Sequence, residues 1–145
     1  MPQDKPNHPT NPVPGARTVL IGEDDLDDQE LLKEIFISID GSFTLFFAAN
    51  GSQVLSYLDK NPDDLPCLII LDYNMPGLNG AEILKELKKS KRFNSIPKII
   101  WSTSRSGTYK DICLELGAND YLVKPSNLND LVEICRYMLS VCAIS

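Results

Sequence analysis

Hydrophobic and polar positions along the chain form repeating blocks that predict five strand–helix units. Short apolar runs alternate with longer segments in which apolar residues recur every three or four positions, as on one face of a helix. This alternation predicts an α/β fold, with a parallel sheet, right-handed crossovers and helices on both faces. The predicted strands cover residues 18–22, 43–48, 68–72, 98–101 and 120–123, and the predicted helices cover about 27–39, 51–58, 79–89, 107–116 and 127–141.

The third predicted strand has the most distinctive pattern. Four apolar residues, Leu68 to Leu71, lead into Asp72, and a loop rich in Pro, Gly and Asn then runs to Gly80. An unbroken apolar run between turn residues is typical of a strand buried on both faces. Asp72 would then stand at the carboxyl end of that strand, where open α/β sheets place their chemistry. Taken alone, Asp72 is either a cap for the loop or a reactive group.

Polar residues whose side chains can take part in chemistry follow most of the other predicted strands as well. The carboxyl ends of parallel strands meet at one edge of a sheet, so these groups should share one shallow pocket. Three carboxylates in such a pocket repel one another unless a cation intervenes, and a hard ion such as Mg²⁺ suits oxygen ligands. A lysine and a hydroxyl beside them suit phosphoryl transfer to a carboxylate. The residues are Glu23 and Asp24 after the first strand, Asp72, Ser102 and Lys124.

Length and composition narrow the class of protein. A chain of 145 residues with 43% hydrophobic residues is expected to form one globular domain. The net charge of −6 argues against nucleic acid as a direct partner. There is no run of membrane-spanning length and no signal peptide, which indicates a cytoplasmic protein without a membrane partner. The sole histidine, His8, leaves no basis for Ser-His-Asp or Cys-His catalysis.

Two further features concern the ends of the chain and its cysteines. Residues 1–16 contain five of the ten prolines and are expected to form a flexible, Pro-rich tail, which leaves residues 17–145 as the folded domain. The cysteines lie in apolar contexts without the paired spacing of a metal site. We expect them to be reduced thiols in the core of a cytosolic protein. They are Cys67, Cys113, Cys135 and Cys142.

The order of these motifs resembles the receiver domain of two-component response regulators, of which chemotaxis regulators are one kind. The motifs are Glu23-Asp24, the segment from Asp72 to Gly80, Ser102 and Lys124-Pro125. Together they cover about residues 17–141. The resemblance implies a flavodoxin-like, doubly wound five-stranded parallel sheet with strand order 2-1-3-4-5.

The same resemblance implies a role for each residue of the pocket. Asp72 would be the phosphoacceptor, and Lys124 would bind the phosphoryl oxygens. Ser102 and Tyr121 would form the switch pair that reports phosphorylation. The ligands of Mg²⁺ would be Glu23, Asp24, Asp72 and the main-chain carbonyl of Asn74.

Three positions vary the pattern of the family. Asn79 stands where Asp is frequent, which changes little because both residues cap helices well. Ser102 replaces the commoner Thr and keeps the hydroxyl. Thr103 stands where Ala or Gly is usual. A β-branched side chain there is expected to narrow the access of the phosphodonor and of hydrolytic water to Asp72.

These observations predict a signalling switch that takes its phosphoryl group from a histidine kinase or a phosphotransfer protein. Such a domain catalyses its own phosphorylation and slow dephosphorylation but is not an enzyme acting on other substrates. A haloacid-dehalogenase-type hydrolase would need a second Asp where Asn74 stands. A flavodoxin would need a Ser/Thr-rich phosphate loop after the first strand. The alternative is a degenerate, phosphate-independent binding module, which would have lost Asp72, the acidic pair or Lys124.

Only Ala143, Ile144 and Ser145 follow the core stripe of the last helix, which leaves no room for an output domain, so this helix is expected to carry the output surface. Ile134, Tyr137 and Val141 extend its apolar face beyond the core stripe. They either cover a wider core or contact a downstream protein or a second copy, together with the fourth helix and the fifth strand. The predicted core stripe is Leu128, Leu131, Val132, Cys135, Met138, Leu139 and Cys142.

Overall fold

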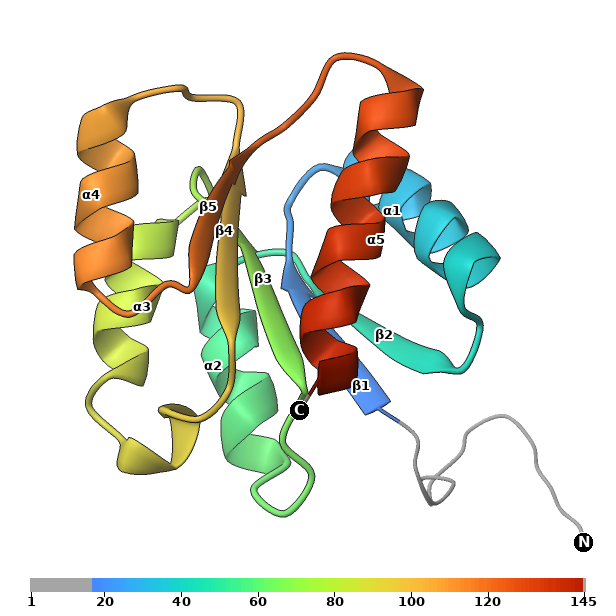
Figure 1. Ribbon diagram of the computed structural model, residues 1–145. Helices are drawn as coiled ribbons and strands as arrows, with labels where there is room; N and C mark the ends of the chain where they lie inside the picture. Colours follow the sequence, from blue (N-terminus) through green and yellow to red (C-terminus); the bar gives the residue numbers. More distant parts are fainter. Residues whose placement is uncertain (1–16, 145) are drawn as a thin grey trace, which may run out of the picture.

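The computed structural model describes residues 17–144, and within them strands and helices alternate as the sequence predicts (Figure 1). The predicted tail, residues 1–16, lies outside the described residues. The elements are β1 (Arg17–Gly22), α1 (Leu26–Ile39), β2 (Phe43–Ala48), α2 (Gly51–Lys60), β3 (Leu68–Asp72), α3 (Gly80–Leu87), the 3₁₀ helix η1 (Lys91–Phe93), β4 (Lys98–Ser102), α4 (Gly107–Glu115), β5 (Asp120–Val123) and α5 (Leu128–Ile144).

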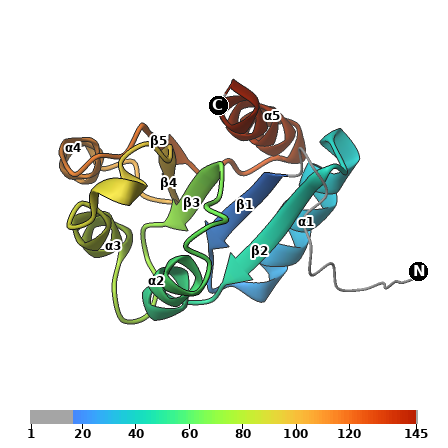
Figure 2. The same ribbon diagram turned by 90° about the horizontal axis from the view of Figure 1, so that it is seen from below.

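The five strands form one parallel sheet in the order β2-β1-β3-β4-β5. This confirms the flavodoxin-like topology. Helices α1 and α5 cover one face of the sheet, and α2, α3 and α4 cover the other (Figures 1 and 2). All five residues of β3 are buried, as expected for the central strand. Among the helices within residues 17–144, none is long and apolar enough to cross a lipid bilayer.

Side-chain caps determine where the helices begin. Asn79 accepts a hydrogen bond from the Glu82 amide at 2.8 Å, and Glu82 accepts one from the Asn79 amide at 2.8 Å, which completes a capping box. Asn127 accepts from the amide of Asp130 at 2.9 Å, so it caps α5 from outside the helix. At the end of α4, Gly117 has φ of +104°, a conformation that glycine adopts at little cost.

Two apolar clusters fill the two faces of the sheet, and most predicted core residues belong to them. Leu128 does not: it is 59% exposed, so its assignment to the core stripe of the last helix was wrong. Leu128 is the first residue of α5, and it is exposed although it lies on the apolar stripe of the helical wheel. Ile134 and Val141 are half-buried against the α1/α5 cluster, whereas Tyr137 is exposed.

The cysteines do not all behave as expected. Cys113 and Cys135 are free and buried, which agrees with the prediction. Cys67 and Cys142 form a disulfide with a Cα–Cα distance of 5.1 Å, so the prediction of reduced core thiols was wrong for this pair. The two residues are 75 positions apart in the sequence. They meet because the segment before β3 passes beside the end of α5, a contact that spacing along the chain does not reveal.

Candidate functional site

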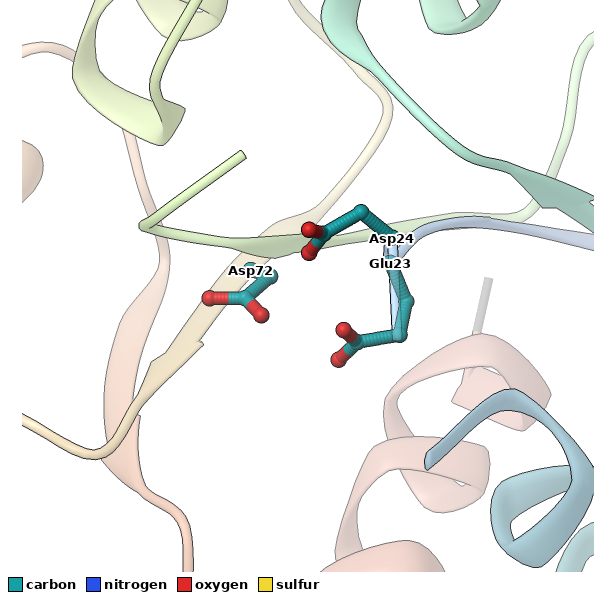
Figure 3. A group of neighbouring side chains, drawn as sticks. All are labelled: Glu23, Asp24 and Asp72. Atoms are coloured by element: carbon teal, nitrogen blue, oxygen red, sulfur yellow. The ribbon is translucent and has the colours of Figure 1, made fainter. Parts of the chain in front are cut away.

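Three carboxylates from two neighbouring strands gather at the carboxyl edge of the sheet. Glu23 and Asp24 directly follow β1, and Asp72 ends β3. Each offers an oxygen, and these oxygens all lie within 4.8 Å of one another. Figure 3 shows the three side chains arranged around a common space. Glu23 and Asp72 are buried and Asp24 is exposed, so the cluster opens to solvent on the Asp24 side.

Lys124 reaches the cluster from the end of β5. Its ammonium group donates to Asp72 Oδ2 at 2.8 Å, to Glu23 Oε1 at 3.0 Å and to Asp28 Oδ2 at 3.2 Å. An ammonium has three N–H donors, so each of them has a carboxylate acceptor. Asp28 was not predicted as a residue of the site. The only available signal was its position in the first turn of α1, where an acidic residue is also explained by the helix dipole.

The charges in this cluster shift one another's protonation. Burial raises the pKa of Glu23 from 4.5 to about 7, and the negative charge of Asp72 adds to the rise. The Asp25 amide and Lys124 partly oppose it. For Lys124, burial favours the neutral form, but the hydrogen bond and charge of Asp72, together with Glu23, raise its pKa above the ordinary value. The site therefore holds a permanent positive charge among carboxylates that repel one another.

The loop after β3 is hydrogen-bonded to the carboxylate of Asp72. The amide of Asn74 donates to Asp72 Oδ1 at 3.0 Å, while Lys124 occupies Oδ2. Asp72 therefore caps its own loop and also faces the acidic cluster. Its two interpretations from sequence, structural cap and reactive group, are compatible in the fold.

Ser102 and Tyr121 are connected through Ser104. Ser102 is buried, and its Oγ accepts a hydrogen bond from the Ser104 amide at 3.0 Å. The Tyr121 hydroxyl donates to the Ser104 carbonyl at 2.9 Å, and its ring is buried. The loop after β4 thus links the two residues predicted to form the switch pair. Ser104 was not predicted, although it belongs to the polar run Ser102-Thr103-Ser104.

A cavity of about 330 Å³ adjoins Lys124 on the side of α1 and α5. Asp28, Leu31, Trp101 and Thr103 are among its lining residues, and Thr103 is exposed. The Lys124 ammonium lies 4.5 Å from the centroid of the Trp101 ring, within the range of a cation–π contact. From sequence, Trp101 was only the last apolar residue of a strand.

Comparison with known proteins identifies the family. The model of the response regulator receiver domain matches residues 19–136, which is most of the chain. The chain belongs to the response regulator receiver family. It is 34% identical over 125 residues to the two-component response regulator ORR5 of rice, Oryza sativa subsp. japonica. That match covers 86% of this chain and 90% of ORR5. It is also 37% identical to the transcriptional regulatory protein CpxR of Klebsiella pneumoniae, over 83% of this chain and 48% of CpxR.

Solved structures of receivers have the same fold. The Mn²⁺-bound form of the response regulator Rcp1 superposes with a TM-score of 0.76 at 28% identity, over 86% of this chain and 92% of Rcp1. The phosphorylated cyanobacterial phytochrome response regulator RcpA gives a TM-score of 0.78 at 26% identity, over 86% of this chain and 95% of RcpA. Receivers are signalling switches of two-component systems that interact with histidine kinases or phosphotransfer proteins. The predictions of family and fold class are therefore confirmed.

Proposed function

We propose that residues 17–145 act as a cytoplasmic receiver that is phosphorylated on Asp72 by a histidine kinase or a phosphotransfer protein. The observation that carries this proposal is the contact of Lys124 with Asp72, at 2.8 Å, beside the carboxylates of Glu23 and Asp24. A buried carboxylate with a cationic partner and acidic neighbours is suited to accept a phosphoryl group. Both the family and the phosphorylated state of RcpA support it.

The oxygen ligands that the site offers suit Mg²⁺. Glu23, Asp24 and Asp72 offer carboxylate oxygens, which hard divalent cations prefer, and their mutual repulsion favours a cation. We propose these three side chains and the main-chain carbonyl of Asn74 as its ligands. When bound, Mg²⁺ would neutralise charge on the phosphoryl oxygens. The Mn²⁺-bound form of the similar regulator Rcp1 supports a divalent ion in this family.

Different groups of the site would have different roles in phosphoryl transfer. A carboxylate oxygen of Asp72 attacks the phosphorus of a phosphohistidine, and the new O–P bond forms as the P–N bond to the donor breaks. Lys124 would hold a phosphoryl oxygen, which requires it to leave at least one of its present carboxylate acceptors. The Asn74 amide on Asp72 Oδ1 fixes the orientation of the carboxylate. A water that attacks the same phosphorus breaks the O–P bond to Asp72, which releases inorganic phosphate and restores the carboxylate.

The signal would leave the site through the loop after β4. A new hydrogen bond from the Ser102 hydroxyl to the phosphoryl group would draw Ser102 toward Asp72. Because Ser104 binds both Ser102 and Tyr121, such a movement changes the support of the Tyr121 ring. We propose Ser102 and Tyr121 as the switch pair on this basis. In this structure the Tyr121 ring already lies inward, so a shift of the loop is the expected first event.

The proposed output surface lies on α4, β5 and α5. Ile112 on α4 and Tyr137 on α5 are exposed apolar or aromatic side chains of these elements. Tyr137 donates to Asp120 Oδ2 of β5 at 2.7 Å, which ties α5 to the strand. A surface groove of about 420 Å³ lies between the β4–α4 loop and α5, with Ile134 and Lys124 among its lining residues. A downstream protein or a second copy would bind here.

The proposal is tested by phosphorylation with a small phosphodonor such as an acyl phosphate. The wild type with Mg²⁺ should gain one phosphate by intact-mass measurement, and Asp72→Asn should gain none because it lacks the nucleophile. A chelator should abolish labelling of the wild type.

The matched control is Asp63→Asn, which removes an exposed carboxylate remote from the site. It should be labelled like the wild type. Undiminished labelling of Asp72→Asn would refute the assignment of the acceptor.

A further inference from the structure

The sole tryptophan of the chain lies directly beneath the lysine of the phosphorylation site. Trp101 comes from β4 and is 3% exposed. Its ring centroid is 4.5 Å from the Lys124 ammonium, which is itself mostly buried. Tryptophan is the strongest cation–π partner among the side chains, and the contact strengthens when water is excluded. The Lys124 ammonium thus has the carboxylates as hydrogen-bond acceptors and the indole as an aromatic contact.

The indole of Trp101 is not explained by packing alone. Its Nε1 is buried and has no hydrogen-bond partner, the only such side-chain atom among the described residues. A buried donor without an acceptor destabilises the fold, and buried tryptophans usually satisfy it. An aliphatic residue at this position in the sheet would avoid the cost. The π face of the ring is therefore the part of the side chain that the site uses.

The contact of Lys124 with the Trp101 ring is of another kind than its hydrogen bonds to carboxylates. The three carboxylates that accept from Lys124 include Glu23 and Asp72, which we propose as Mg²⁺ ligands. These carboxylates change partners when the cation and the phosphoryl group enter. The ring of Trp101 cannot ligate a hard cation and has no charge to exchange. It remains a fixed attractive surface while the ammonium moves from carboxylate to phosphoryl oxygen.

We infer that Trp101 is a positioning residue for phosphoryl transfer: its ring holds the Lys124 ammonium where it can contact the phosphoryl oxygens. The inference rests on the proposed function of Lys124. It predicts that Trp101 affects recognition of the phosphoryl group much more than cation binding, because its described contact in the site is with Lys124, which we propose to hold a phosphoryl oxygen, while the proposed Mg²⁺ ligands are other residues. A residue that served only the packing of the α1/α5 face would disturb both.

The test compares binding of Mg²⁺ with binding of beryllofluoride, which mimics a phosphoryl group on a carboxylate. Both are measured by isothermal titration calorimetry on the full chain. Trp101→Leu should weaken beryllofluoride binding in saturating Mg²⁺ by about three- to thirty-fold, which corresponds to the usual range of cation–π contacts. The affinity for Mg²⁺ alone should stay within about twofold. Trp101→Phe keeps a weaker π face and should show a smaller loss.

A double-mutant cycle separates positioning from packing. In a Lys124→Met background, Trp101→Leu should cause no further loss of beryllofluoride binding, because the ring has no ammonium to hold. Equal losses for Mg²⁺ and beryllofluoride, losses that add in the double variant, or unchanged beryllofluoride binding in Trp101→Leu would each overturn the inference. If Trp101→Leu does not fold, Trp101→Phe decides by the same two affinities and the same cycle. Failure of the wild type to bind beryllofluoride would instead refute the proposed function.

Discussion

At the scale of single residues, the buried Glu23 links protonation to stability. Its pKa is raised from 4.5 to about 7 mainly by burial, so the folded chain binds a proton more tightly than the unfolded chain. The resulting stabilisation is fully present below about pH 4.5 and is lost as the pH rises through about 7. In metal-free buffer, the free energy of unfolding should therefore fall between pH 5 and pH 7.5, by on the order of 2 kcal/mol.

Urea unfolding at several pH values measures this loss. Glu23→Gln cannot titrate, so its stability should change much less over the same interval. Added Mg²⁺ should restore the stability of the wild type at pH 7.5, because a bound cation favours the ionised carboxylate. A wild type that gains stability as the pH rises from 5 to 7.5 in metal-free buffer would contradict the assignment.

Thr103 is expected to set the lifetime of the phosphorylated state. Its exposed side chain borders the cavity beside Lys124, and it is stiff at its first torsion. In-line attack by water needs close approach to the phosphorus and good alignment, so crowding there could slow hydrolysis about tenfold. Thr103→Ala should lose phosphate faster than the wild type after removal of the donor.

The measurement is the decay of the phosphorylated mass with time. Entry of the phosphoryl group should also be faster in Thr103→Ala if crowding is the cause. Thr108→Ala, at an exposed position in α4, is a control that should decay like the wild type. Equal or slower decay in Thr103→Ala would mean that the threonine is neutral or orients the water.

At the scale of elements, the disulfide fastens the end of α5 to the start of β3. Cys67 and Cys142 enclose a long loop, and the Arg17 guanidinium also donates to the Cys142 carbonyl at 2.8 Å. Closing a long loop restricts the unfolded chain, and disulfides typically stabilise a fold by roughly 2–4 kcal/mol. Reductant should lower the free energy of unfolding by this amount.

Cys67→Ser provides the matched variant for this experiment. It should be less stable than the oxidised wild type, and reductant should not change its stability further. Identical unfolding curves for the wild type with and without reductant would show that the bond adds nothing in solution. Thiol titration of the unfolded chain reports the fraction of oxidised protein in each sample.

At the scale of the whole molecule, the proposed output surface on α5 lies close to the proposed phosphorylation site, because Ile134 and Lys124 line the same groove. Ile134 is half-buried and lines the groove near Lys124, so it is placed to contact a partner without leaving the core. Ile134→Glu puts a charge into this apolar contact and should weaken self-association or partner binding of the phosphorylated form by about tenfold or more. Light scattering after size exclusion measures self-association, and titration with the cognate partner measures partner binding.

A control on the same helix tests whether the effect is local. Arg136→Glu changes an exposed residue of α5 whose only described ion pair, with Glu133, is a weak surface contact. It should retain association, and both variants should keep the helical content of the wild type. If Ile134→Glu leaves self-association and partner binding untouched, the α4–β5–α5 surface is not the output.

The sequence by itself determined the family, the strand order through resemblance, and the residues at the strand ends. The central strand is an unbroken apolar run between turn residues, so a one-dimensional pattern is enough to locate the strand that ends at Asp72. The carboxyl edge of a parallel sheet then brings Glu23, Asp72 and Lys124 together whatever the details of packing. The confirmed fold and the described carboxylate–lysine contacts follow from these local rules.

Only the tertiary structure decided which distant side chains meet. The contact of Asp28 with Lys124, the ring of Trp101 beneath the same ammonium and the pairing of Cys67 with Cys142 join segments far apart in the chain. Each of these residues also has a simple local explanation. An acidic residue such as Asp28 suits the helix dipole, an apolar residue such as Trp101 suits a core strand, and cysteines in apolar segments suit buried thiols. Periodicity records whether a residue faces the core, but it does not record which residue it faces, because that depends on how the helices lie across the sheet.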